Sequence, residues 1–344
     1  MSVMVTGIGF IGGHVVRDLL AAGEDVVLYG LFGGKDEQDE TRPDLAYLDD
    51  LLDGLDHPGT MTVVVGDIRD LPRIRHTVEE HGVRSIAHLA SLVSGASEAD
   101  VPRAIDINID GTVNIFRAAA DTGVERVVWA SSINVYGPRS FAHGDVIDDE
   151  SPLDPSTVYG SCKAFLERLA SAYHRNHGLN AVGLRLSRVY GFGEHTKAGR
   201  PGGSTFLDGL LRIPATGAGP AVIPFGDQEI DLQYVEDVSA AFVQALGRRE
   251  GAGETFLTSG DRRPIAEAFE FVKTLLPDAD IRLATDAESA QLPKGAQKNW
   301  AYRFDPSRAE RVLGIKSTYP MEEGFFRTIS AYRNYAGLPP LDRG

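Results

Sequence analysis

The sequence predicts an α/β fold with a doubly wound parallel sheet of about seven strands. Short apolar runs alternate along the chain with segments of helical periodicity, which is typical of parallel strands joined by crossover helices. The first run is followed directly by a glycine-rich turn and a helix, and the fifth by a pair of serines. The expected strands cover residues 3–5, 25–29, 61–65, 85–89, 126–130, 180–186 and 255–258.

The first strand leads into the turn TGIGFIG of residues 6–12. In this turn, Gly7 would allow a tight bend, Gly9 the close approach of a pyrophosphate, and Gly12 close packing of helix and strand. The N-terminus of the helix that follows would face the negative charge of a phosphate. The order of strand, turn and helix predicts a dinucleotide-binding site, and a glycine-rich turn without a ligand is the alternative.

The connection between the second and third strands, residues 31–60, is unusually long, and its apolar periodicity over residues 45–55 predicts a helix. Connections of this length often have a function. This one either covers the adenosine end of the cofactor or decorates the surface, and decoration is favoured. The second strand ends in Tyr29-Gly30, where an acidic residue would hold the ribose of NAD. Only Lys35 could meet a 2′-phosphate, so the choice between NAD and NADP stays open.

The fifth strand is followed by SSINVYG, residues 131–137. In open parallel sheets, ligands bind beyond the carboxyl ends of the strands. A hydroxyl at this place, such as that of Ser132, can donate a hydrogen bond to a reacting oxygen. The alternative is that the serines only form a turn.

Tyr159 and Lys163 lie four residues apart, which places them on one face of a helix. A free phenol has a pKa of roughly 10 and is a poor base at neutral pH. A nearby ammonium favours the phenolate and lowers that pKa. The pair therefore predicts a proton donor and acceptor, and an exposed helix pair is the alternative.

After residue 191 the sequence changes in character. Residues 192–203 are rich in glycine, charge and proline, which predicts a mobile loop over the site. A helix is expected over residues 204–213. A second flexible run is expected over residues 214–220.

Composition excludes several classes of protein. The chain has 344 residues, 42% of them hydrophobic, and a formal net charge of −15. That charge disfavours nucleic acid and anionic membrane surfaces as partners. One cysteine, Cys162, excludes an internal disulfide and a cysteine-based metal cluster, and a small packed side chain is its expected role. No apolar run is long enough to span a membrane, and no signal peptide precedes the first strand. A cytoplasmic enzyme is therefore expected.

With these three motifs in this order, the chain resembles the extended short-chain dehydrogenase/reductase family, also called the NAD-dependent epimerase/dehydratase family. The resemblance covers nearly the whole length. Supporting runs are GDIRD (66–70), HLAS (88–91), NIDGTVN (108–114), ESPLDP (150–155), VYG (189–191), YVEDV (234–238) and DPSRA (305–309).

The resemblance implies a Rossmann-like cofactor domain and a smaller, interleaved α+β substrate domain. The cofactor domain would comprise residues 1–186 and 231–260, and the substrate domain residues 187–230 and 261–340. A homodimer through the helices around residues 102–120 and 157–176 is also implied. The substrate would be a small molecule bound between the two domains.

The resemblance also implies roles for individual residues. Tyr159 would be the acid/base, Lys163 would hold the nicotinamide ribose and lower the tyrosine pKa, and Ser132 would bind the same substrate oxygen. His88 would be a core residue, and no metal site is expected. The implied cofactor contacts are Gly7, Gly9, Phe10, Ile11, Gly12, Asp67, Ile68, Leu89, Ala90, Asn108 and Lys163, with Asp67 and Ile68 flanking the adenine and Asn108 more often structural. The implied substrate contacts are Ser94, Ser132, Asn134, Arg188 and Lys294.

Departures from the family pattern narrow the chemistry. The glycine turn is one residue shorter than the usual form. Sugar-nucleotide dehydratases carry an Asp-Glu pair after the serine, whereas Ile133 and Asn134 stand here and cannot titrate, so dehydration is not expected. An arginine that pairs with a diphosphate is replaced by Ile230. Arg188 suits an anionic substrate or an internal ion pair equally well.

Three functions remain. The first is an NAD(P)-dependent oxidoreductase that transfers a hydride at a hydroxyl or carbonyl carbon of a sugar-like or small polyhydroxy or keto substrate. The second is a nucleotide-sugar epimerase with tightly bound NAD. The third is a non-catalytic dinucleotide-binding sensor, which the intact Ser132, Tyr159 and Lys163 disfavour. NAD is the expected cofactor, and NADP is not excluded.

Overall fold

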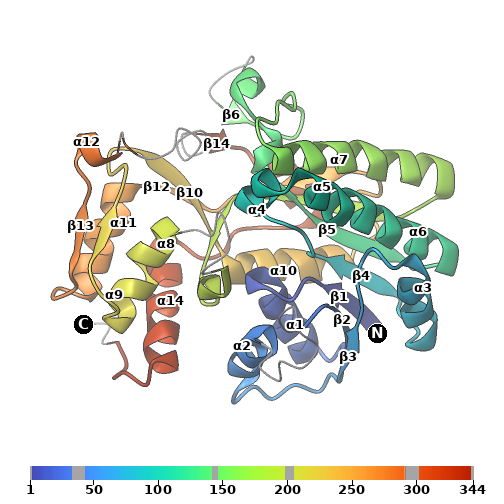
Figure 1. Cartoon of the computed structure of the whole chain (residues 1–344), viewed down its shortest axis with the longest axis horizontal. Helices are drawn as coiled ribbons and strands as arrows, with labels where there is room; N and C mark the ends of the chain where they lie inside the picture. The colour runs from blue at the N-terminus through green and yellow to red at the C-terminus, as the bar shows by residue number, and fades with distance from the viewer. Residues whose placement is uncertain are drawn as a thin grey trace.

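The seven expected strands form one parallel sheet in a computed structural model of the chain (Figure 1). The structure describes residues 2–32, 43–141, 146–197, 205–289, 291 and 302–341. The strand order is β11-β7-β5-β4-β1-β2-β3, so the chain reverses direction across the sheet between β1 and β4. Ligands bind at such a switch point in open α/β sheets. The strands are β1 (Ser2–Thr6), β2 (Asp25–Gly30), β3 (Met61–Val65), β4 (Ser85–His88), β5 (Arg126–Ser132), β7 (Ala181–Leu186) and β11 (Thr255–Leu257).

Helices cover both faces of this sheet, which explains why its central strands are apolar along their whole length. All seven residues of β5 are buried. Val128 and Ala130 face the core that includes α1 and α10. Val127 and Trp129 alternate with them and face the core on the opposite side, which includes α3, α6 and α7. The helices are α1 (Phe10–Ala21), α3 (Leu71–Glu80), α6 (Thr112–Thr122), α7 (Val158–His177) and α10 (Val235–Leu246).

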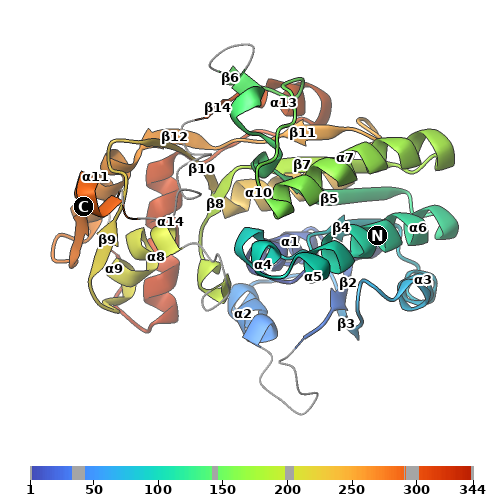
Figure 2. The same cartoon turned by 45° about the horizontal axis from the view of Figure 1, so that its top comes forward.

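A second, smaller layer packs beside the carboxyl edge of the main sheet (Figure 2). It contains a three-stranded sheet, in which β10 (Glu229–Tyr234) pairs with β8 (Arg188–Tyr190) and β12 (Asp261–Pro264). The expected boundary at residue 231 falls inside β10. The remaining elements are β9 (Ala221–Ile223), β13 (Ile281–Leu283), α8 (Thr205–Leu210), α9 (Arg212–Thr216), α11 (Ile265–Leu275), α12 (Asp286–Ser289) and α14 (Met321–Tyr335).

Short elements complete the chain between and after these layers. They are α4 (Ser94–Ala99), α5 (Val101–Ala104), a π-helical segment (Ile105–Gly111), β6 (Val146–Ile147), β14 (Arg303–Phe304) and α13 (Ser307–Leu313). No helix among the described residues is both long and apolar enough to cross a lipid bilayer.

Two expectations about connections need correction: the insertion as surface decoration, and the loop after residue 191. The helix predicted over residues 45–55 is confirmed as α2 (Pro43–Leu52). It buries Tyr47 and Leu48, so this part of the insertion is not mere surface decoration. The loop predicted over residues 192–203 is described up to residue 197, and there Phe192 and Glu194 are buried in a turn rather than part of an open loop.

Candidate active site

A cleft of about 1280 Å³ opens where the carboxyl edge of the main sheet meets the smaller layer. One end is lined by the glycine-rich turn and by the residues after β2 and β3. The middle is lined by the residues after β4 and β5 and by the first turn of α7. The far end is lined by β8, β9 and α8. The cleft therefore lies beyond the carboxyl ends of the strands, as the sequence predicts, and at the switch point of the sheet.

The glycine-rich turn has the backbone that the sequence predicts for a phosphate site. Gly7 has φ 81°, and a Cβ there would lie 2.3 Å from the backbone nitrogen of Ala90. A Cβ on Gly9 would meet nothing within 4 Å, so a ligand can approach the backbone closely. Gly12 packs on the carbonyl oxygen of Gly7, from which a Cβ would be 2.2 Å distant. Helix α1 begins at Phe10 with no acidic residue in its first turn and no side-chain cap. The turn therefore fits the pyrophosphate of a dinucleotide.

The end of β2 differs from the usual ribose site. The Tyr29 ring is buried beneath the backbone of Gly66, and its hydroxyl donates to the Asp67 carbonyl oxygen over 2.9 Å. Tyr29 therefore stands where the sequence usually has the ribose-binding acidic residue, but it does not line the cleft. Asp67 lines the cleft, but its carboxylate accepts hydrogen bonds from the Arg69 guanidinium. The sequence did not single out Arg69, because it follows β3 rather than β2. Lys35 lies outside the described residues.

Most of the remaining cofactor contacts inferred from the sequence also line the cleft, but Asn108 and Lys163 do not. Phe10, Ile11, Ile68, Leu89 and Ala90 all contribute to the cleft wall. Asn108 is fully buried behind it. Its amide donates to the Leu92 carbonyl oxygen over 3.1 Å and accepts from the Leu92 N–H over 2.7 Å. Asn108 therefore supports the segment after β4 and is not placed to touch a cofactor.

The expected reacting groups meet at the middle of the cleft. The Tyr159 phenol is hydrogen-bonded to Ser132 and Ser91. The Asn134 amide donates to the Ser132 hydroxyl over 3.2 Å and to Ser94 over 3.5 Å. Three of the expected substrate contacts, Ser94, Ser132 and Asn134, are thereby brought together near Tyr159. The sequence missed Ser91, although it is the last residue of the HLAS run after β4.

Local structure explains how Tyr159 reaches Ser132. Thr157 caps α7 by accepting a hydrogen bond from the Gly160 N–H over 3.0 Å, which places Tyr159 in the first helical turn. A Cβ on Gly160 would lie 2.1 Å from the carbonyl oxygen of Asn134. The absence of a side chain at Gly160 therefore lets α7 begin directly against the turn that follows β5.

The expected effect of Lys163 on Tyr159 is wrong in this structure. The ammonium nitrogen lies 5.3 Å from the centre of the Tyr159 ring, and Lys163 is buried. Burial raises the pKa of Tyr159 to about 12, although the hydrogen bonds with Ser91 and Ser132 oppose it. Burial also lowers the pKa of Lys163 to about 8. In both cases the largest cause is desolvation, which penalises the charged form.

The low pKa of Lys163 predicts a pH-dependent cost to stability. Between pH 8 and its ordinary value of 10.5, the unfolded state binds more protons than the folded state, so stability rises with pH in that window. Without added NAD, Lys163→Met should therefore be more stable than the wild type at pH 7, by up to about 3 kcal/mol. The advantage should shrink towards pH 10.5. Urea unfolding of both proteins at pH 7 and pH 10 measures this, and a pH-independent difference would contradict it.

The far end of the cleft carries one expected substrate contact beside an acid. Arg188 lines the cleft together with Glu194. Burial lowers the pKa of Arg188, and the charge of Glu194 opposes this. Both interpretations of Arg188 therefore have structural support, since it faces the cleft and also has an acidic neighbour. Lys294, the other expected cation, lies outside the described residues.

Two titratable side chains near the site belong to the core, as expected. His88 is buried between the hydroxyls of Thr6 and Thr112, at 2.7 and 2.9 Å. Burial lowers the pKa of its imidazole to about 3, so the ring is neutral. Cys162 is buried in α7, and burial raises the pKa of its thiol. In the part of the chain that the structure describes, no three His, Cys, Asp or Glu residues are grouped to hold a metal ion.

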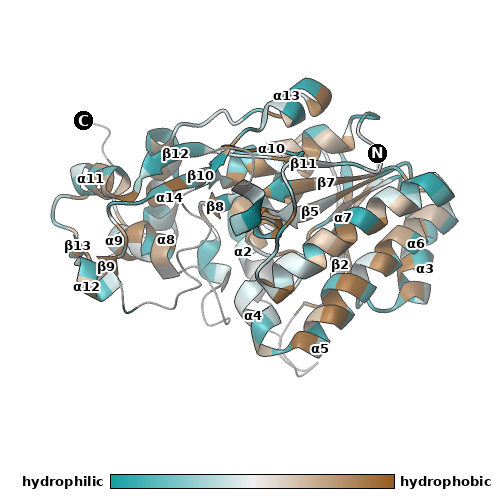
Figure 3. Cartoon of the chain, turned by 90° about the horizontal axis from the view of Figure 1, so that it is seen from above, coloured by the Kyte–Doolittle hydropathy of each residue, from teal (hydrophilic) through white to brown (hydrophobic). Residues whose placement is uncertain are grey.

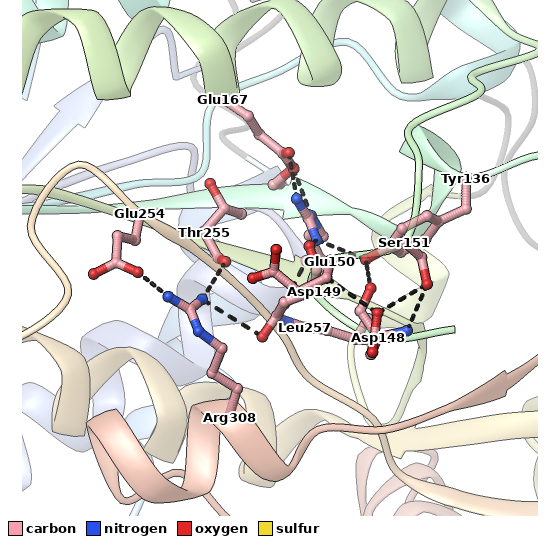
Figure 4. Close-up of polar contacts among 12 residues, drawn as sticks. Tyr136, Asp148, Asp149, Glu150, Ser151, Glu167, Glu254, Thr255, Leu257 and Arg308 are labelled. Atoms are coloured by element: carbon pink, nitrogen blue, oxygen red, sulfur yellow. Dashed lines mark hydrogen bonds and ion pairs between the residues drawn. The ribbon is translucent and has the colours of Figure 1, made fainter. Parts of the chain in front are cut away.

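A buried charge network lies behind the reacting groups. Glu167, one turn after Lys163, accepts a hydrogen bond from Ser131 over 2.6 Å and two from Arg185 over 2.9 and 2.7 Å. Figure 4 shows how the network continues through Asp149 to Arg308 of α13. Through these contacts, α7, the end of β5 and the C-terminal part of the chain are held together.

The chain matches a family model described as "NAD dependent epimerase/dehydratase family" over residues 3–257. It is 28% identical to D-erythronate dehydrogenase of Cupriavidus necator, covering 98% of this chain and 99% of that protein. It is 26% identical to UDP-glucuronate 4-epimerase of Thermodesulfobacterium geofontis, covering 95% and 94%. The solved structure of Thermus thermophilus UDP-glucose 4-epimerase in complex with NAD superposes with a TM-score of 0.72 at 25% identity, covering 97% of this chain and 99% of that one.

Proposed function

We propose, on the premise that the chain belongs to the NAD dependent epimerase/dehydratase family, that it is an NAD-dependent oxidoreductase. Its substrate would be a sugar-like or small polyhydroxy acid, oxidised at a hydroxyl-bearing carbon. The observation that carries the proposal is the continuous cleft. It joins the phosphate-binding turn at Gly9, the reacting pair Ser132 and Tyr159, and a polar far end at Arg188.

The residues have distinct roles in this proposal. Tyr159 would act as the acid/base on the substrate oxygen, accepting the hydroxyl proton as the phenolate in oxidation and donating it as the phenol in the reverse reaction, and Ser132 would bind the same oxygen. Lys163, buried beside the Tyr159 ring, would hold the ribose next to the nicotinamide. Gly7, Gly9 and the first turn of α1 hold the pyrophosphate. NAD, when bound, supplies the hydride acceptor.

The far end of the cleft supports a small acid better than a nucleotide diphosphate. Ile230, which replaces a diphosphate-binding arginine, is buried and lines the cleft. The positive charge of Arg188 interacts with the carboxylate of Glu194, and the further acids Asp231 and Glu288 also line this end. A single carboxylate needs one cation, whereas a diphosphate needs more. The similarity to D-erythronate dehydrogenase agrees with a sugar acid.

A nucleotide-sugar epimerase that keeps its NAD is the second candidate. The observation in its favour is an apolar region at the far end, where Phe206, Ile213 and Phe225 line the cleft. An aromatic base could pack there. Ile133 and Asn134 lack the acid and base of an elimination, so dehydration is not proposed.

The two candidates differ in what happens to NAD. We expect purified protein to reduce added NAD in the presence of D-erythronate, followed as the rise in absorbance at the NADH band. We expect no such rise with UDP-glucuronate or UDP-glucose. Epimerisation of either sugar nucleotide without net NADH, together with NAD released from the protein on denaturation, would replace the first candidate by the second. If a wider panel of sugar acids gave no NAD reduction and no epimerisation, both candidates would be contradicted.

A homodimer and two domains form part of the proposal. Helix α7 lies beside α5 (Figure 3) and also contacts the π-helical segment, and all three elements carry exposed apolar side chains. They are Val101, Ile105 and Phe165, at 41%, 43% and 50% exposure. Pairing of these helices with a second copy would cover them. The cofactor domain would comprise residues 1–186 and 231–260, and the substrate domain residues 187–230 and 261–340.

A further inference from the structure

Tyr47 of α2 fills a slot between the glycine-rich turn and the segment of residues 191–196. Two glycines from distant parts of the sequence leave room for its ring. A Cβ on Gly13 would lie 2.7 Å from Tyr47 Cε1, and a Cβ on Gly193 would lie 2.0 Å from Tyr47 Oη. Gly193 also has φ 105°. The ring is 2% exposed, so the insertion between β2 and β3 reaches the wall of the site.

The Tyr47 hydroxyl joins the two sides of this slot. It lies 3.2 Å from the carbonyl oxygen of Phe10 and 3.1 Å from that of Phe192, and it can donate to either. Phe10 begins α1, immediately after the phosphate-binding turn. The Phe192 carbonyl oxygen also contacts His14 Nε2 of α1 at 2.8 Å. Three elements therefore converge on one backbone carbonyl group.

The position of the segment matters for the substrate end of the cleft. Glu194 and Thr196, which follow Phe192, both line the cleft. Glu194 is the acidic neighbour of Arg188. Aromatic rings also pack against this segment. Phe192 contacts Tyr47 with 5.8 Å between ring centres and Tyr332 with 5.1 Å.

We propose that Tyr47 is a positioning residue that links the dinucleotide end of the cleft to its substrate end. Its hydroxyl holds the Phe192 backbone relative to Phe10, so ordering of the glycine-rich turn by a dinucleotide also orders residues 191–196 and fixes Glu194 relative to Arg188. The linkage is a coupling between two binding sites through one hydrogen-bonding group. It rests on the proposed function only in taking NAD as the ligand of the turn.

Tyr47→Phe tests this link, because it removes the hydroxyl and keeps the ring. Amide hydrogen exchange of the full-length protein is measured with and without NAD, and NAD affinity is measured by calorimetric titration. Without NAD, exchange of residues 191–197 should become about fivefold faster, the effect of one lost hydrogen bond. In the wild type, NAD should slow exchange there. In the variant this NAD-dependent slowing should be clearly weaker, with only the His14 contact to the Phe192 carbonyl oxygen left between α1 and the segment, while the Kd for NAD changes by less than about twofold.

Tyr335→Phe is the matched control. Tyr335 packs against Phe192 and His195 in the same aromatic cluster, at 5.7 and 5.3 Å between ring centres, but is 54% exposed. It should leave exchange of residues 191–197 and its response to NAD as in the wild type. A general loss of packing would accelerate exchange of α10 as well, and such a uniform change in Tyr47→Phe would contradict the positioning role.

Other outcomes also decide the inference. Unchanged exchange of residues 191–197 in Tyr47→Phe would overturn it, and so would an NAD response equal to that of the wild type. A wild type that binds NAD without any slowing at this segment would overturn it too. Failure of the proposed function would instead appear as a wild type that does not bind NAD, and the exchange measured without NAD would still decide whether Tyr47 holds the segment.

Discussion

Replacing Tyr159 by Phe is expected to lower turnover by at least about 100-fold, the scale of lost general acid–base catalysis. The substitution removes the phenol oxygen that would exchange a proton with the substrate and leaves the ring that packs near Lys163. NAD affinity should change by less than about twofold, since the turn at Gly7 and Gly9 is untouched. Steady-state rates with the sugar acid that proves active in the NAD-reduction assay, and NAD titrations, measure both quantities.

Tyr173→Phe is a matched control for this prediction. Tyr173 lies on the same helix, α7, and its ring packs on Phe116 rather than in the cleft, with 5.9 Å between ring centres. The control should keep normal turnover. Near-normal turnover in Tyr159→Phe would remove this residue as the acid/base. Loss of NAD binding in that variant would show that the phenol supports the cofactor site instead.

Much of the fold was predictable because its signals are local. The strands are short apolar runs, and β5 is apolar throughout because helices cover both faces of the sheet. The glycine-rich turn, the serines after β5 and the Tyr159–Lys163 spacing each lie within a few residues of sequence. Parallel topology then brings the carboxyl ends of the strands to one edge, so the meeting of Ser132 and Tyr159 was also predictable.

The parts that sequence reasoning missed depend on contacts between distant segments. Arg69 reaches the cleft from the end of β3, and Glu194 comes from a turn whose burial no local pattern indicated. Tyr47 belongs to an insertion for which the sequence favours surface decoration, and the space for its ring is left by Gly13 and Gly193, which lie far apart in the sequence.

The prediction of a lowered pKa for Tyr159 was wrong for a related reason. Spacing along a helix gives the distance between a phenol and an amine, but the sign of the net shift depends on how much water the fold removes from both. Here burial dominates, and the phenol pKa stands at about 12 instead of below 10.

Replacing Arg185 by Met is expected to lower the free energy of unfolding by about 3–5 kcal/mol, the cost of removing one partner from a buried ion pair. The Arg185 side chain is 7% exposed. Its guanidinium binds both carboxylate oxygens of Glu167 and donates to the Tyr136 hydroxyl over 2.6 Å. It also lies 3.5 Å from the Asp149 carboxylate, which is 3% exposed. The variant would leave two buried acids without their main cation.

The contacts with Glu167 also determine the direction in which the pKa of Arg185 is shifted. Burial alone would lower it, but the hydrogen bonds and charge of Glu167 raise it above its ordinary value. Arg185→Met keeps the aliphatic part of the side chain and deletes the guanidinium, so the loss of stability contains both the lost network and the space left by the guanidinium, and the double-mutant cycle below separates the two. Urea unfolding measures the loss.

The exposed pair of Arg84 and Glu125 provides the contrast that tests the role of burial. These side chains make a similar contact, 2.6 Å long, but are 57% and 51% exposed. Arg84→Met should therefore cost no more than about 1 kcal/mol. Equal losses from Arg84→Met and Arg185→Met would show that burial does not set the strength of the inner pair. In a double-mutant cycle, adding Glu167→Gln to Arg185→Met should cost much less than Glu167→Gln alone, because the buried carboxylate that needed the arginine is then gone.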